Sequence, residues 1–356
     1  MKTTTAIRGL GRTTLLGAMI AMSSAAQADE ALPRLEVQWQ GFDIRLTGGA
    51  ASQAAVFDDN DPATDSPDAK VDLFARINAQ WTSPGGIIIG VNAEQNSRRR
   101  ASEVLEAGEI YGFVASDYGR VEVGLQDGPA DTLAFAAPLV ALGQVRGEFS
   151  RYAGTQALLR ALDTQDAFKV IYLSPPVEGL RGGVSYSPKV RRNPAAVDSR
   201  ERIEVNDAFE FGVQYQKPVG DWILGASGGY ATGQADPLTT RADLNSWSVG
   251  AEARRGSLRI GAAYVDRGDS NRLDRGFDQW EVNGGVGWIT PGWGVAGSVA
   301  MTRSSDRENR LIGVGGFYRL HPNIEIRADV VSFREERFLF AVDEGFASVL
   351  EIQFTI

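Results

Sequence analysis

Charged residues at alternate positions of short apolar runs are the groups of this chain best placed to act on ions or polar molecules. The runs are 42–47, 70–81 and 119–126, and the alternating charges in them are Asp43, Arg45, Arg76, Arg120 and Glu122. Because successive residues of a β-strand point to opposite faces, this spacing gathers the charges on one face and the apolar residues on the other. Fixed charges so arranged act through their field, by binding and selecting ions and polar solutes.

Covalent catalysis has little support in the composition. The chain has one histidine, His321, in a predicted turn before Pro322, and it has no cysteine. A Ser-His or Cys-His pair on one face therefore has no candidate, and a thiolate metal site is excluded. We expect no enzyme activity, no cofactor and no metal site; a mechanism based on acids alone is the enzymatic alternative that the residues leave open.

A long polar segment, 127–166, carries a second group of charges. Its acids are Asp127, Asp131, Glu148, Asp163 and Asp166, and its basic residues are Arg146, Arg151 and Arg160. The apolar stretch from Leu133 to Leu142 predicts that the segment packs against another part of the molecule. A surface loop is the alternative.

The elements that must position these charges are short alternating runs, which predict an all-β fold. The runs lie near 35–50, 70–83, 86–97, 106–117, 119–127, 167–176, 180–189, 207–218, 222–233, 244–255, 258–268, 277–290, 293–304, 310–320, 324–335 and 346–356. Their even spacing favours one closed antiparallel sheet of about 16 strands over two domains. The alternation changes phase between 35–40 and 42–47, so we expect a bulge near Gly41.

The connections and the aromatic residues indicate which solvent surrounds this sheet. Short turns such as 83–86 and 255–257 alternate with long polar loops at 51–69, 128–166 and 190–206, as in transmembrane β-barrels. Two strand faces carry aromatic residues eight positions apart, which corresponds to a rise of about 20 Å along a tilted strand. The pairs are Trp222 with Tyr230 and Trp280 with Trp288. A soluble sandwich with an aromatic core is the alternative.

Both ends of the chain agree with an exported membrane barrel. Lys2, Arg8 and Arg12, a short apolar core and Ala26-Gln27-Ala28 predict a signal peptide over 1–28 and a mature barrel over 29–356. Its removal takes the formal net charge from -9 to -12. In 346–356, apolar residues alternate with mostly polar ones, which is typical of a closing strand with one lipid-facing side.

Three passages resemble the Gram-negative general (non-specific) porins. Residues 109–127 resemble the strand–turn–strand passage that leads into the constriction loop of these porins, Phe74-Ala-Arg-Ile77 resembles an early wall strand, and the terminal strand is the third. The chain departs from the family where Phe354 is followed by two residues and where only the Glu148-Phe149 core of the loop motif remains.

The resemblance implies an outer-membrane barrel, a homotrimer, whose long segment 127–166 folds inward as a constriction loop. It implies Arg76 and Arg120 as wall bases and Glu148 as a loop acid, whereas Arg45 is placed by strand parity alone. The predicted pore constriction comprises Arg45, Arg76, Arg120, Glu122, Asp127, Asp131 and Glu148.

We therefore expect passive diffusion of small hydrophilic solutes, with a weak preference for cations because the mature chain is acidic. Expected partners are outer-membrane lipid and lipopolysaccharide, and the net charge makes nucleic acid an improbable partner. A substrate-specific channel and a plugged structural or adhesive barrel are the alternatives that the sequence leaves open.

Overall fold

The computed structural model describes residues 35–58, 66–96, 106–142, 163–191, 203–238, 240–270, 279–304, 307–337 and 342–356. Almost all regular structure in these residues is β-strand. The elements are β1 (Leu35–Trp39), β2 (Phe42–Asp58), β3 (Asp68–Thr82), β4 (Ile88–Asn96), β5 (Glu106–Ser116), β6 (Gly119–Leu125), α2 (Pro129–Thr132), β7 (Phe168–Leu173), β8 (Leu180–Arg191), β9 (Ile203–Val219), β10 (Trp222–Ala235), β11 (Leu244–Arg255), β12 (Leu258–Gly268), β13 (Gln279–Ile289), β14 (Trp293–Arg303), β15 (Arg307–His321), β16 (Ile324–Arg337) and β17 (Asp343–Thr355).

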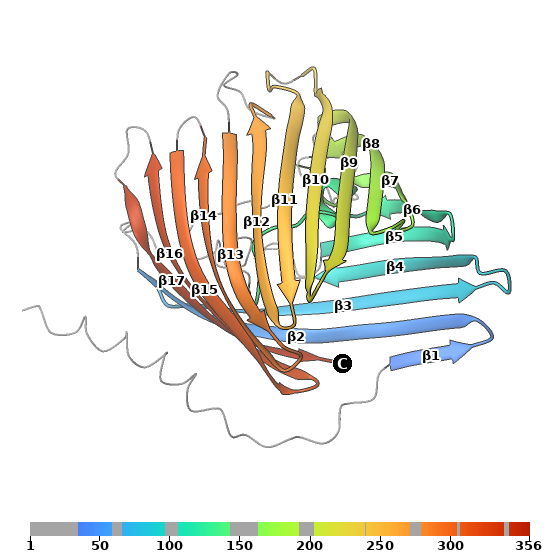
Figure 1. Cartoon of the computed structure of the whole chain (residues 1–356), viewed down its shortest axis with the longest axis horizontal. Helices are drawn as coiled ribbons and strands as arrows, with labels where there is room; N and C mark the ends of the chain where they lie inside the picture. Colours follow the sequence, from blue (N-terminus) through green and yellow to red (C-terminus); the bar gives the residue numbers. More distant parts are fainter. Residues whose placement is uncertain are drawn as a thin grey trace, which may run out of the picture.

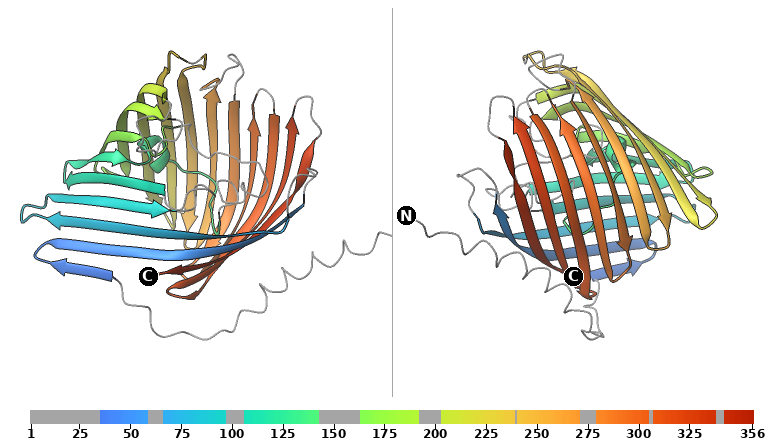
Figure 2. Two further views of the ribbon diagram at one scale, coloured as in Figure 1. Left: turned by 180° about the vertical axis from the view of Figure 1, so that it is seen from behind. Right: turned by 60° about the vertical axis from the view of Figure 1, so that its left-hand side comes forward.

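The sixteen strands β2 to β17 form one closed antiparallel barrel, in which each strand pairs with its neighbours in the sequence (Figures 1 and 2). Closure comes from β17, whose residues Phe346 to Thr355 pair with Asp58 to Gly49 of β2. A closed sheet leaves no long edge whose backbone groups would lack partners in lipid, so the predicted fold class is confirmed.

The N-terminal part of the barrel differs from the prediction of a bulge near Gly41. The first run is two strands joined by a tight turn, and Trp39 pairs directly with Phe42. Gln40 and Gly41 have φ values of 44° and 85°, the left-handed conformations that a two-residue hairpin turn requires. The change of phase that suggested a bulge therefore marks a reversal of chain direction.

Strand β1 pairs with the same edge of β2 as β17 does. It lies further along that edge, past the C-terminal residue Ile356. Leu35 to Trp39 pair with Leu46 to Phe42, whereas β17 pairs from Gly49 onward. Ile356 exchanges two backbone hydrogen bonds with Gly48, of 2.8 and 3.2 Å, between these two stretches. The edge of β2 is thereby paired by two separate segments.

The loop predicted over 51–69 is also shorter than expected. β2 continues to Asp58 and β3 begins at Asp68, so 51–58 belongs to the barrel wall. Residues 51–56 are Ala-Ser-Gln-Ala-Ala-Val, with small residues on both faces of the strand. The apolar–polar alternation that would predict a strand is therefore not visible in the sequence.

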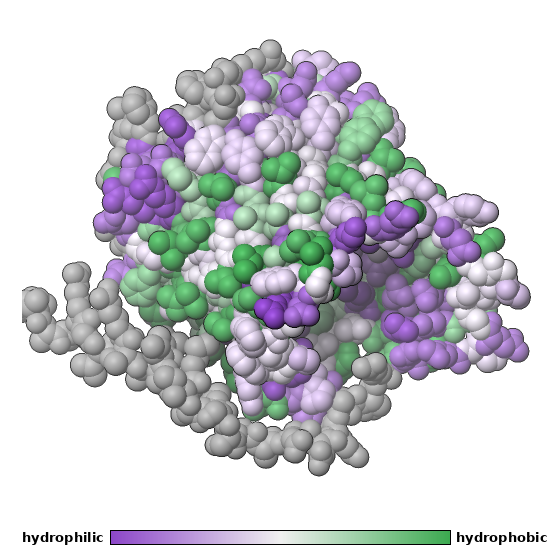
Figure 3. Space-filling view, in the orientation of Figure 1, coloured by the Kyte–Doolittle hydropathy of each residue, from purple (hydrophilic) through white to green (hydrophobic). Residues whose placement is uncertain are grey.

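Strand parity divides the wall as the sequence predicts. Val71, Leu73, Val121 and Val123 are exposed on the outer face, whereas Glu122 and Gln126 are buried on the inner face. Hydrophobic residues gather across the middle of the outer surface in Figure 3, with a hydrophilic patch toward its upper left. Within the described part of the chain, no helix has the length and apolar character needed to cross a membrane.

Aromatic residues on the outer face form rows near both ends of the strands. One row crosses β10 to β13, where Trp247 lies 5.4 Å from Tyr264 and Tyr264 lies 6.5 Å from Trp280 between ring centroids. Near the short turns, Phe42 lies 6.3 Å from Trp39 and 6.4 Å from Trp81. Two aromatic rows bounding an apolar band are the arrangement of a barrel that spans a membrane.

Candidate functional site: the inner wall and the segment that lines it

The first described part of the long segment, 127–142, lies against the inside of the barrel. Its short helix α2 packs on β8, β9 and β10. Beyond the helix, Phe135 N donates to Ser227 Oγ of β10 at 2.8 Å, and Ala137 N donates to Asn283 Oδ1 of β13 at 2.9 Å. Backbone amides of this irregular segment thus donate hydrogen bonds to side chains of the inner wall instead of to water.

Glycines on the wall permit this close approach. A Cβ added at Gly212 or Gly250 would lie 2.0 Å from the carbonyl oxygen of Pro129 or Phe135, respectively. A Cβ added at Gly261 would lie 2.2 Å from the carbonyl oxygen of Ala136. Inward glycines on β9, β11 and β12 therefore form a track, along which the segment can run because the wall has no side chains there.

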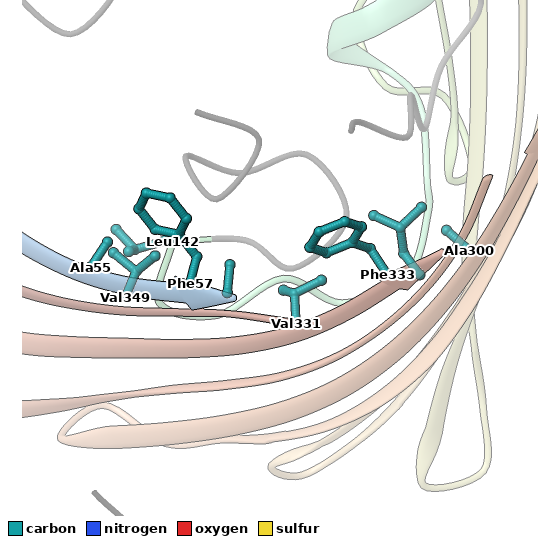
Figure 4. Close-up of a cluster of buried hydrophobic side chains, with 9 residues drawn as sticks. Ala55, Phe57, Leu142, Ala300, Val331, Phe333 and Val349 are labelled. Carbon is teal, nitrogen blue, oxygen red and sulfur yellow. The ribbon is translucent and has the colours of Figure 1, made fainter. Parts of the chain in front are cut away.

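The track ends at Leu142, which packs into an apolar cluster on the far side of the lumen. Figure 4 shows Leu142 beside Ala55, Phe57 and Val349, with Phe333 and Val331 along the same wall. The full set of buried residues in the cluster is Ala55, Phe57, Leu142, Ala300, Leu311, Val331, Phe333, Ala347 and Val349. Apolar inward-facing residues are unusual in a water-filled barrel, and here the segment covers them.

Acidic residues gather where the segment leaves and rejoins the wall. The carboxylates of Glu109, Asp127 and Asp166 lie within 4.8 Å of one another, as do those of Asp127, Asp131 and Asp163. Carboxylate oxygens are the ligand type that hard cations prefer. Such a group gives this part of the lumen a negative potential.

The predicted basic residues are spread along the inner wall, and each has an acidic neighbour. Arg76 Nε donates to Glu94 Oε2 at 2.9 Å, and Arg45 Nη2 lies 2.7 Å from Asp43 Oδ2. Pairing with a carboxylate leaves each arginine with reduced net charge toward the lumen, so the fields of these bases are weaker than the sequence alone suggests.

Arg120 is held from two sides. It is ion-paired with Glu122, and its guanidinium carbon lies 3.7 Å from the centroid of the Phe113 ring. A cation over an aromatic face gains electrostatic attraction, and the ring also fixes the direction of the side chain.

The seven predicted constriction residues lie at different depths. Arg45 and Arg120 are close to the short-turn ends of β2 and β6, and Arg76 is near the middle of β3. Asp127 and Asp131 lie at the opposite end of β6, in the acidic group. The structure brings Arg120 to Glu122 and Asp127 to Asp131, and Glu148 lies outside the described residues.

Sequence reasoning missed several inward-facing residues that complete this wall. Glu94 and Phe113 are the partners of Arg76 and Arg120, and Lys169 and Glu210 form a buried ion pair beneath the segment. Parity could have placed Glu94 and Glu210, because each alternates with outward apolar residues in its strand. Their partners depend on neighbouring strands, which a single run does not show.

Comparisons with known proteins agree with this geometry. A family model described as Gram-negative porin matches residues 13–337. No curated protein sequence matches the chain.

Among solved structures, an anion-selective porin from Comamonas acidovorans is similar with a TM-score of 0.64 at 13% identity, over 88% of this chain and 100% of the other. The outer membrane channel DcaP of Acinetobacter baumannii gives 0.60 at 13% identity, over 89% and 98%. A trimer form of OmpT of Vibrio cholerae gives 0.62 at 12% identity, over 89% and 100%. At these identities the likeness concerns the fold.

Proposed function

This chain belongs to the Gram-negative porin family and is an outer-membrane channel protein, and on that basis we propose that it is a general porin. In this proposal, small hydrophilic solutes and ions diffuse through its lumen down their gradients. The function requires no bond-making chemistry, since pore radius and the field of fixed charges set what passes.

The observation that carries the proposal is the contrast between lined and unlined parts of the inner wall. Segment 127–142 covers β9 to β13, whereas the side chains of Arg45 and Arg76 on β2 and β3 are 56% and 54% exposed. Long charged side chains that remain in water are expected along a hydrated passage. A lumen filled throughout by protein would bury them or pair them completely.

We assign the narrow part of this passage to the residues predicted for the constriction. Arg76 and Arg120 supply positive charge from the wall, Glu122, Asp127 and Asp131 supply negative charge, and Arg45 lies toward the short-turn end. Glu148 completes the set from the part of the loop outside the described residues. Opposed charges across a narrow pore orient water and polar solutes, and they disfavour apolar ones.

The proposed ion preference is weak and favours cations. The acidic group around Asp127 is negative, and the wall bases Arg76 and Arg120 are each paired with an acid. The similar porin from Comamonas acidovorans is anion-selective by its own description, so the fold alone does not fix the sign.

The proposed assembly is a homotrimer surrounded by lipid and lipopolysaccharide. A trimer form among the similar structures supports the oligomer. The exposed apolar residues of the outer face support contact with lipid chains. The acidic residues Asp58 and Asp68, at the ends of β2 and β3, support bridging of divalent cations to lipopolysaccharide phosphates.

Planar-bilayer recording of the purified protein tests the proposal. We expect stepwise conductance that rises with salt concentration, and a reversal potential of the cation-selective sign in a salt gradient. Absence of conductance would favour the plugged barrel. Liposome swelling with sugars of increasing size separates the remaining alternative, because a general porin shows rates that fall smoothly with size, whereas a substrate-specific channel saturates with one solute.

A further inference from the structure

A buried ion pair lies where the two ends of segment 127–166 meet the barrel wall. Lys169 of β7 and Glu210 of β9 are both 0% exposed, with 3.4 Å between Lys169 Nζ and Glu210 Oε1. The pair reaches across β8, whose inward residues there are the small Ser185 and Ser187. A buried charge pair is costly to desolvate, so its geometry must be closely held to persist.

The returning end of the segment is bound to this pair. The backbone N of Thr164 donates to Glu210 Oε1 at 3.0 Å, and the Thr164 hydroxyl donates to the same oxygen. Lys169 Nζ also donates to the carbonyl oxygen of Gln165 at 2.6 Å. Glu210 thus accepts hydrogen bonds from the last residues of the segment, and Lys169 donates one to them.

The departing end of the segment passes directly against the same carboxylate, without a hydrogen bond to it. A Cβ added at Gly128 would lie 1.7 Å from Glu210 Oε2, closer than any real contact. Gly128 has φ of -89° and ψ of 174°, which any residue can adopt, so the restriction comes from the carboxylate and not from the backbone. No group among the described residues donates a hydrogen bond to Oε2.

We propose that Lys169 and Glu210 are positioning residues for the pore. The pair holds the returning end of the segment by hydrogen bonds, and its carboxylate is the surface against which the departing end packs at Gly128. Together these contacts set how far the segment projects into the lumen. This inference rests on the proposed function for its consequence, because the segment narrows a conducting passage only if the barrel conducts. The pair itself touches no solute. It acts through the segment that it anchors.

The first test is Gly128→Ala, with Gly292→Ala as its matched control. The new methyl group collides with the Glu210 carboxylate. Either the departing end moves off the wall into the lumen, or the carboxylate moves and loses its bonds to Thr164 and Lys169, which releases the returning end. Nothing lies within 4 Å of a Cβ added at Gly292. We expect single-channel conductance to fall by about twofold in Gly128→Ala, since the narrowest cross-section limits the current, and to stay at the wild-type value in the control.

A double-variant background shows whether the effect passes through the carboxylate. In Lys169→Met/Glu210→Ala, the obstacle to a side chain at 128 is gone, and no buried charge is left without a partner. Adding Gly128→Ala to this background should change the conductance no further. An equal fall in both backgrounds would contradict the proposal, because the collision with Glu210 could not then be its cause.

A position readout separates this inference from the proposed function. The chain has no cysteine, so Ala137→Cys and Asn283→Cys can be joined specifically across the contact between segment and wall. We expect oxidative cross-linking to fall in Gly128→Ala and in Lys169→Met/Glu210→Ala, while heat-modifiability on gels shows a folded barrel. If the wild type does not conduct, the porin proposal fails, and cross-linking still decides the positioning role.

Thr164→Val keeps the proposal testable if Gly128→Ala does not fold. It removes one hydroxyl bond to Glu210 outside the strands, and we expect a fluctuating conductance with substates and reduced cross-linking. Wild-type conductance together with wild-type cross-linking in a folded Gly128→Ala, or in Thr164→Val where that variant replaces it, would overturn the positioning role.

Discussion

Two parts of the inner wall share the same strand periodicity but differ in what lies against them: the long segment in one part and water in the other. On β9, β11 and β12, inward positions carry glycine where a Cβ would lie 2.0 to 2.2 Å from carbonyl oxygens of the segment. On β2 and β3, inward positions carry Arg45 and Arg76, more than half exposed. Inward glycines therefore let the backbone of the segment lie directly against the wall, whereas long charged side chains at inward positions remain in water.

The apolar cluster beneath Leu142 belongs to the covered part and should give the largest stability effect. Phe333 is 3% exposed, and Phe333→Ala should lower the free energy of unfolding by about 3–5 kcal/mol, since it opens a cavity between segment and wall. Urea unfolding of the barrel in lipid vesicles measures this. Arg45→Ala on the water-exposed part is the control, with a change within about 0.5 kcal/mol. Equal losses would erase the contrast between the two parts.

The contrast between inside and outside predicts the next largest effect. Val123 is exposed on the outer face, and Val123→Arg should cost about 2–4 kcal/mol near the bilayer midplane, because a charge replaces a lipid-facing methyl group. Arg76→Ala on the inner face should leave heat-modifiability on gels unchanged. If Arg76→Ala fails to fold while Val123→Arg is tolerated, the two faces are reversed and a soluble sandwich is the better description.

Selectivity should respond most where the wall is exposed to water. In the double variant Arg76→Ala/Arg120→Ala, Glu94 and Glu122 lose their partners, so negative charge is left in the lumen. We expect stronger cation preference and a conductance larger by up to about twofold, since two long side chains leave the passage. Reversal potentials in a salt gradient measure the preference. An unchanged reversal potential would place these residues away from the ion path.

The smallest expected effect compares a loop acid with an acid of the outer surface. Glu148→Gln should change selectivity or conductance more than Asp65→Asn does, because a charge at a constriction acts in a focused field. A charge on a wide outer loop is screened within about 8 Å at physiological salt. Both residues lie outside the described part of the chain. Equal and negligible effects would mean that the middle of the long loop does not enter the lumen.

Individual strands can be predicted from the sequence because their residues alternate between apolar side chains that face outward and polar side chains that face the lumen. Val121 and Val123 alternate with Arg120 and Glu122, and that pattern alone separates lipid-facing from inward residues. Prediction failed at 35–58, where a hairpin was interpreted as a bulge and the end of β2 as a loop. In both cases the deciding information was the pairing partner, which local alternation does not contain.

The barrel class, the two faces of most strands and the acidic character of the long segment can be predicted from the amino-acid sequence, because alternation and composition within short runs encode them. Only the tertiary structure decided that Glu210 meets Gly128 and Thr164, that Arg120 lies over Phe113, and that glycines of three separate strands form one track. Such contacts join residues far apart in the chain. They depend on strand register and barrel closure, and no single run encodes either.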